Sequence, residues 1–125
     1  GLAVEAEITD VIVLTGADGV NISDNEMKVT VGVAQGLIRA LTTASKKIRI
    51  ERNFIYSWKA SSTACINLSA DLVNTGIIAN NRLRVTTDGG VAHIGLHANN
   101  DVSLYLNYGV NNKNETGLQV GTASA

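Results

Sequence analysis

The chain has 125 residues with ten basic and eleven acidic side chains, which leaves a formal net charge of −1. This length suits one ordinary domain, and the near-neutral charge argues against nucleic-acid binding, which normally needs a strong positive field. The single cysteine, Cys65, excludes an intrachain disulfide, and no apolar run approaches the ~18 residues of a membrane span, so we expect no membrane insertion.

Short runs of alternating apolar residues predict β-strands along most of the chain. The clearest runs, in chain order, are 11–14, 27–31, 48–50, 83–86 and 102–106, and clusters of Gly, Asn and Asp separate them. Alternation is typical of half-buried strands, and the separating residues are those that tight turns favour. The sequence therefore predicts an all-β fold of antiparallel sheets.

Residues 34–45 are the one stretch with a helical pattern. Leu37, Ile38 and Leu41 make a partial 3.6-residue stripe, but Gly36 weakens it, so a short helix there is the minor alternative. Further along, two alternating arms between residues 83 and 96 flank Asp88-Gly-Gly90, a combination that predicts a β-hairpin.

A weak repeat occupies the first third of the chain. Gly1-Leu2, Gly19-Val20 and Gly36-Leu37 recur at spacings of 18 and 17 residues, and an alternating strand follows each pair. Such a period is typical of fibrous or solenoid proteins, whose units bury their faces against neighbouring units. Coincidence is the alternative, because the chain has 12 glycines.

Few residues suggest catalysis or metal binding. His93 and His97 lie four positions apart, which places them on one face of a helix or a strand, but no third ligand is close in sequence. We expect them to be outward polar residues, with a small metalloprotein or enzyme as the distant alternative. Cys65 sits among apolar residues and is expected to be buried. We therefore predict no enzyme activity, no cofactor and no metal.

Two further patterns concern the surface. Phe54, Tyr56 and Trp58 alternate on one face of a predicted strand, and such a stripe is more often core or subunit interface than a ligand platform. The N-glycosylation pattern occurs at Asn21, Asn67 and Asn114, all of which we expect to be turn or strand residues.

Three segments together resemble the fibre proteins of adenoviruses. Residues 19–32, followed by Gly36-Leu37, are similar to the shaft repeats of that family, in which a Gly-aliphatic start, a polar turn and an alternating strand recur. Tyr56-Ser-Trp-Lys59 resembles the motif that marks entry into the fibre head, and residues 64–79 are similar to the head strand that follows. Only the Trp of that motif is kept, and the short remainder resembles the reduced heads of reptilian or avian adenoviruses.

The resemblance implies a homotrimer in which residues 1–35 form shaft-like β-repeats and residues 36–125 form an antiparallel β-sandwich head. Its implied function is viral attachment at the virion surface, through a host cell-surface receptor that is a protein or a glycan. A bacteriophage tail-fibre, needle or decoration tip is the alternative. Since exposed loops on a rigid sheet carry recognition, we expect receptor contacts from two Asn-rich loops, namely His97, Asn99, Asn100, Asn111 and Asn112.

Overall fold

The computed structural model describes residues 3–6, 10–29, 36–57, 65–85, 92–111 and 116–121, and every structural statement below concerns these residues. They contain fourteen β-strands and no helix. The strands are β1 (Ala3–Ala6), β2 (Asp10–Leu14), β3 (Asn21–Ser23), β4 (Glu26–Val29), β5 (Gly36–Ala40), β6 (Ile48–Glu51), β7 (Phe54–Ser57), β8 (Ile66–Leu68), β9 (Thr75–Ala79), β10 (Arg82–Val85), β11 (Ala92–His97), β12 (Asp101–Tyr105), β13 (Tyr108–Asn111) and β14 (Thr116–Gly121).

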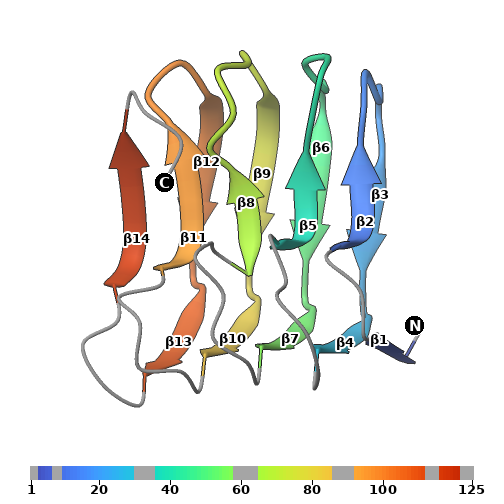
Figure 1. Ribbon diagram of the computed structural model, residues 1–125, viewed down its shortest axis with the longest axis vertical. Helices are drawn as coiled ribbons and strands as arrows, with labels where there is room; N and C mark the ends of the chain where they lie inside the picture. The colour runs from blue at the N-terminus through green and yellow to red at the C-terminus, as the bar shows by residue number, and fades with distance from the viewer. Residues whose placement is uncertain are drawn as a thin grey trace.

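The strands form three sheets that the chain visits in turn. Sheet 1 has the order β1-β4-β7-β10-β13, sheet 2 the order β2-β5-β8-β11-β14, and sheet 3 the order β3-β6-β9-β12. In Figure 1, sheet 2 faces the viewer, sheet 3 lies behind it and sheet 1 runs along the bottom. One circuit through the three sheets makes one coil, and successive coils stack side by side. This architecture is a parallel β-solenoid.

Every pairing between the described strands is parallel. Phe54 of β7, for example, lies between Glu26 of β4 and Arg82 of β10, each 28 residues away in sequence. The all-β prediction is therefore confirmed, whereas the predicted antiparallel direction was wrong. Alternating apolar residues show which side of a strand is buried, but they carry no information on the direction of its neighbour.

The structure also decides against one minor alternative and one local prediction. Where a short helix was the minor alternative, the described residues form strand β5, in which Ile38 pairs within sheet 2 with Ile66 of the next coil. The arms of the predicted hairpin are β10 and β11, which belong to different sheets, β10 pairing with β7 and β13 and β11 with β8 and β14. The turn predicted at 88–90 lies outside the described residues.

The repeat predicted from Gly-aliphatic pairs correctly implied stacked units, but its period of 17 or 18 residues was wrong. Coils are related by steps of 26 to 28 residues over most of the chain, as the pairs Asp10 with Gly36 and Ile38 with Ile66 show. Each unit does bury its face against its neighbours, as a solenoid requires. All three sheets contain strands from both sides of residue 35, so hydrogen bonding does not divide the chain there.

The core is a set of aliphatic side chains stacked in register inside the coils. One stack in each sheet illustrates it, all with at most 5% exposure: Met27, Ile55 and Leu83 in sheet 1, Ile38, Ile66 and Ile94 in sheet 2, and Ile22, Ile50 and Ile78 in sheet 3. Similar side chains repeat at the strand spacing of about 4.8 Å, so each packs on its own counterpart. This arrangement explains a composition rich in Ile, Leu and Val with few aromatic residues.

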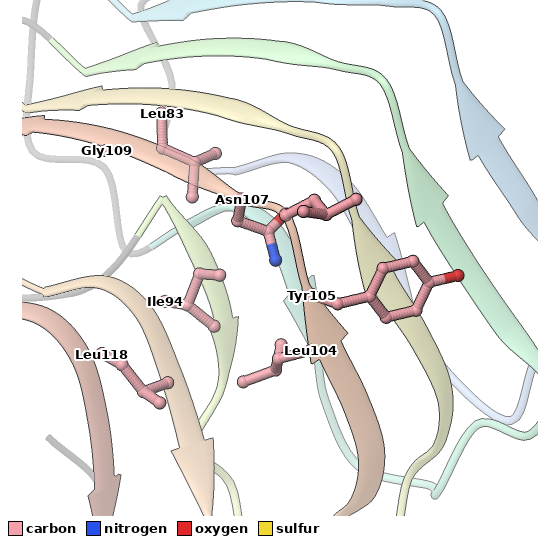
Figure 2. Close-up of a pocket in the computed structure, with 8 residues that line it drawn as sticks. Leu83, Ile94, Leu104, Tyr105, Asn107, Gly109 and Leu118 are labelled. Atoms are coloured by element: carbon pink, nitrogen blue, oxygen red, sulfur yellow. The ribbon is translucent and has the colours of Figure 1, made fainter.

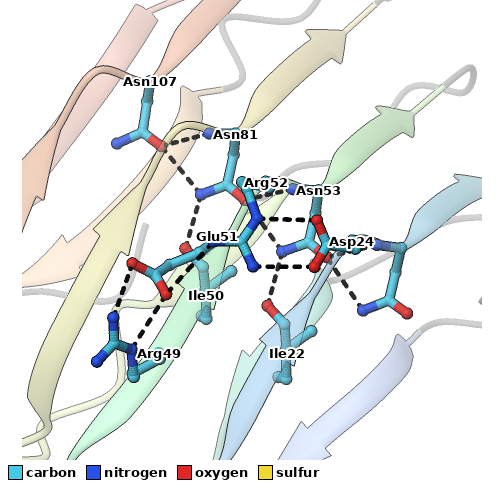
Figure 3. A network of polar contacts seen from close by, with 10 residues as sticks. Ile22, Asp24, Arg49, Ile50, Glu51, Arg52, Asn53, Asn81 and Asn107 are labelled. Carbon is cyan, nitrogen blue, oxygen red and sulfur yellow. Dashed lines mark hydrogen bonds and ion pairs between the residues drawn. The ribbon is translucent and has the colours of Figure 1, made fainter. Parts of the chain in front are cut away.

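A ladder of asparagines fixes the corner where sheet 3 turns into sheet 1 (Figure 3). It consists of Asn25, Asn53, Asn81 and Asn107. The Oδ1 atom of each later member accepts hydrogen bonds from both the backbone N–H and the Nδ2 of the member one coil earlier, at 3.0 or 3.1 Å. Its Nδ2 also donates to a backbone carbonyl of the earlier coil, as Asn81 does to Ile50 at 2.9 Å. The asparagine side chains thus provide hydrogen-bond partners for buried backbone N–H and carbonyl groups that the strand pairing leaves unpaired.

The residue before each ladder asparagine has a left-handed backbone. Asp24, Arg52, Asn80 and Leu106 have φ between 54° and 60°. This conformation makes the sharp bend that redirects the chain from sheet 3 into sheet 1. A second ladder, Ser45, Asn74 and Asn100, holds the corner between sheets 2 and 3 in the same manner.

Candidate recognition surface

The predicted receptor residues of the first loop are mostly engaged within the protein. The His97 side chain is 5% exposed, and its Nδ1 accepts a hydrogen bond from the backbone N–H of Asn99 at 3.2 Å. Asn99 is exposed and donates from Nδ2 to Asp71 at 2.9 Å. Asn100 belongs to the second ladder and donates to the carbonyl of Leu68 at 2.7 Å. His97 and Asn100 therefore support the fold locally, and the expectation that His97 points outward was wrong.

Other predicted residues are placed only in part. Asn111 ends β13 and His93 lies within β11, while Asn112 and Trp58 lie outside the described residues. Of the glycosylation matches, Asn21 and Asn67 are in strands β3 and β8, as expected, and Asn114 lies outside the described residues. The described part of the chain contains no group of three or more His, Cys, Asp or Glu side chains that could hold a metal.

Cys65 is buried, as predicted.

The aromatic residues Phe54 and Tyr56 of β7 face outward. Ile55 is fully buried inside the coil, whereas Phe54 is 38% exposed and Tyr56 is partly exposed on the outer side of sheet 1. The core alternative was therefore wrong for this strand. The strands after β7 continue the stripe because they pair in register: Phe54 lies beside Arg82, and Arg82 beside Tyr108.

These outward residues make one surface, which we call the aromatic–arginine face: Phe54, Tyr56, Arg82, Arg84 and Tyr108. Sequence reasoning found its two β7 aromatics but missed the three residues from β10 and β13. The missing signal was the 28- and 26-residue coil step, which brings those positions to the same face.

The aromatic–arginine face is held together by ring contacts. The rings of Phe54 and Tyr56 lie 6.4 Å apart between centroids, inclined by 30°. The guanidinium of Arg84 lies 5.3 Å from the ring centre of Tyr56, and that of Arg82 lies 5.9 Å from the ring centre of Tyr108. Cation–π contacts of this kind restrain a long side chain without using its N–H donors. A depression of about 110 Å³ is lined by Phe54, Arg82, Leu83, Arg84 and Tyr108.

The arginines of this face differ from Arg49 on β6 and from Arg52 in the corner after β6. Arg52 makes two hydrogen bonds to Asp24, at 2.8 and 2.9 Å, and Arg49 makes two to Glu51, at 3.1 and 3.2 Å (Figure 3). The hydrogen bond from Arg52 lowers the pKa of Asp24, and the same bond raises the pKa of Arg52. Arg82 and Arg84, in contrast, make no ion pair with any carboxylate in the described ranges.

A larger, apolar cavity of about 360 Å³ lies among the last strands of the solenoid (Figure 2). Leu83, Ile94, Leu104 and Leu118 line it from four strands, and Leu118 is 46% exposed. Its lining continues the aliphatic core and offers few polar groups to orient a ligand. The aromatic–arginine face, which combines rings with charged donors, is therefore the stronger candidate for a recognition surface.

Comparisons with known proteins leave the function to be inferred from this geometry. No helix in the described segments is long and apolar enough to cross a membrane. No family model, curated protein or solved structure matches the chain.

Proposed function

We propose that this chain is an attachment module that binds a surface glycan through its aromatic–arginine face. One observation carries the proposal: exposed aromatic rings alternate with arginines that lack ion pairs in the described structure, on the outer side of a regular parallel sheet. A sugar ring presents a C–H face that stacks on an aromatic ring and hydroxyl oxygens that accept hydrogen bonds from arginine.

The spacing of the face suits an extended glycan. Phe54 and Tyr108 lie two strands apart in sheet 1, with Arg82 between them. Two strand spacings amount to about 10 Å, which is comparable with a disaccharide unit of an extended chain. A glycan lying across the strands would therefore meet an aromatic ring, an arginine and a second aromatic ring in succession. Because the sheet holds these residues in place, little ordering is needed on binding.

The solenoid also bears on the choice between the viral alternatives. The adenovirus resemblance implied an antiparallel sandwich head, and the described strands are parallel instead. A bacteriophage tail-fibre, needle or decoration tip requires no such head, and a stack of coils supplies a long, regular surface. We therefore favour that setting, with the protein at the virion surface as a homotrimer. Light scattering on the purified chain tests the assembly, since a homotrimer has three times the monomer mass.

A glycan array tests the binding function directly. Phe54→Ala and Tyr108→Ala each remove one exposed ring, and Tyr105→Ala is the matched control because Tyr105 is a similarly exposed aromatic residue on sheet 3. We expect each face variant to weaken binding at least about tenfold, and the control to leave it unchanged.

Circular dichroism would show that the variants keep their fold, because both rings lie outside the core. Absence of glycan binding by the native chain, or equal binding by all four proteins, would refute the proposal.

A further inference from the structure

We infer that the ligand of the aromatic–arginine face is an acidic glycan, whose carboxylate groups are bound by Arg82 and Arg84. This inference rests on the proposed function and adds the chemical class of the sugar. It follows from the charge of the face, the absence of ion pairs at the two arginines in the described structure, and the contact of each guanidinium with a tyrosine ring.

The charge of the face is opposite to that of the chain as a whole. Lys28 of β4 lies in the same outward row as Tyr56 and Arg84, and Glu26 lies in the row of Phe54 and Arg82. Glu5 of β1 stands beside Lys28 in the register of the sheet, so three cations and two carboxylates give this side of sheet 1 a local charge of +1, against −1 for the whole chain. Glu26 is two strands away from Arg82, or about 10 Å, so it does not neutralise that arginine by contact.

Arg49 of β6 and Arg52, in the corner that follows β6, show how arginines that stabilise the fold are paired in this chain. Arg49 and Arg52 each use two N–H groups on a carboxylate of their own chain. Arg82 and Arg84 have no such partner in the described structure, although both are exposed and side by side on one strand. A carboxylate of a ligand would form with each of them the bidentate ion pair that Arg49 and Arg52 already make within the chain.

Ring stacking prepares the two arginines for this role. The guanidinium carbons of Arg82 and Arg84 lie over the rings of Tyr108 and Tyr56, and because a ring contact occupies no carboxylate-binding N–H, these donors are left for a ligand. Lysine would present a mobile point charge instead of this planar fork. Carboxylate recognition therefore predicts that even a charge-preserving Arg→Lys change weakens binding.

The row order gives the ligand a direction. Arg82 lies between Phe54 and Tyr108 in one row, and Arg84 is two residues further along the same strand, about 6.6 Å away. A sugar chain that stacks on both rings would therefore carry its carboxylates over β10. Its end over β4 would be neutral, because Glu26 repels an anion there.

The experiment compares glycans that differ in one group. Oligomers of a uronic acid and the same oligomers with every carboxylate reduced to an alcohol are titrated into the full chain by calorimetry. The variants are Arg82→Gln, Arg84→Gln and Arg82→Lys, and Lys47→Gln is the control that removes one exposed charge from the corner before β6, away from sheet 1. We expect the acidic oligomer to bind the native chain at least about tenfold more tightly than the reduced one.

The variants then separate the two levels of the proposal. Each arginine variant should lose most of the preference for the acidic oligomer, while Lys47→Gln keeps it. Equal binding of both oligomers, abolished by Phe54→Ala, would refute the carboxylate inference and leave the glycan proposal standing.

A third titration uses single-stranded DNA, because aromatic rings beside arginines also suit nucleic acids. If DNA bound more tightly than any glycan, and lost its affinity in the same variants, both proposals would be overturned.

Discussion

Replacing Asn81 by alanine should remove much of the stability of the solenoid. The Asn81 side chain is fully buried and makes four hydrogen bonds between coils. Its loss leaves two buried backbone groups without these partners, the N–H of Asn53 and the carbonyl of Ile50. Each such group costs about 1–3 kcal/mol, so we expect the free energy of unfolding to fall by about 4 kcal/mol.

Urea unfolding, followed by circular dichroism, measures this loss. Asn107→Ala is the matched comparison, because Asn107 occupies the same ladder position in the last described coil and is only half-buried. Water can replace part of its bonding, so we expect a loss of about 2 kcal/mol there. If Asn81→Ala cost less than about 1 kcal/mol, or no more than Asn107→Ala, the ladder would not be the stabilising element that we infer.

Three further changes test other parts of the fold. Leu106 is 77% exposed with φ of 54°, so Leu106→Asn should stabilise the protein by about 1 kcal/mol in the same urea assay, because Asn tolerates this conformation better. If the free energy of unfolding of Leu106→Asn did not exceed that of the native chain, the inferred backbone strain at Leu106 would be contradicted. Arg52 lowers the pKa of Asp24, so the stability from this pair is present above the unfolded pKa of Asp24 and is lost as pH falls through its lower folded pKa. The melting temperature of Asp24→Asn should therefore fall less than that of the native chain between about pH 5 and pH 2, and parallel curves would refute this. Gly76 has φ of 149°, and a Cβ there would meet the backbone of Ile48. Gly76→Ala should thus cost at least about 3 kcal/mol or prevent soluble expression, and native-like stability would contradict the close approach.

The sequence predicted strands well and their partners poorly. All five predicted strand runs overlap strands of the structure, because alternation reports burial directly. Partner choice depends on contacts about 28 residues away, which a local pattern does not contain. The Asn-rich clusters were interpreted as tight turns of antiparallel sheets, since Asn suits both such a turn and the left-handed corner of a solenoid.

A signal for the coil did exist in the sequence. An aliphatic residue stands three positions before each ladder asparagine, in Ile22-Ser-Asp-Asn25, Ile50-Glu-Arg-Asn53, Ile78-Ala-Asn-Asn81 and Leu104-Tyr-Leu-Asn107. The aliphatic residue is the inward member of sheet 3, and the asparagine is the corner. The aliphatic residue and the asparagine recur together because every coil needs a side-chain amide at this corner. The Gly-aliphatic pairs reflect no such constraint, and they gave the wrong period.

The ladder and the aromatic–arginine face are linked by position in the chain. The residue directly after each ladder asparagine is the first residue of a sheet 1 strand and points outward: Glu26, Phe54, Arg82 and Tyr108. Hydrogen bonds between the asparagines fix the register of this outward row, while the inward stack of Met27, Ile55 and Leu83 supplies the burial. The row can therefore change in chemistry without changing the fold. In a binding module this separation allows specificity to vary one coil at a time, and it places the recognition residues next to the most constrained corner of the solenoid.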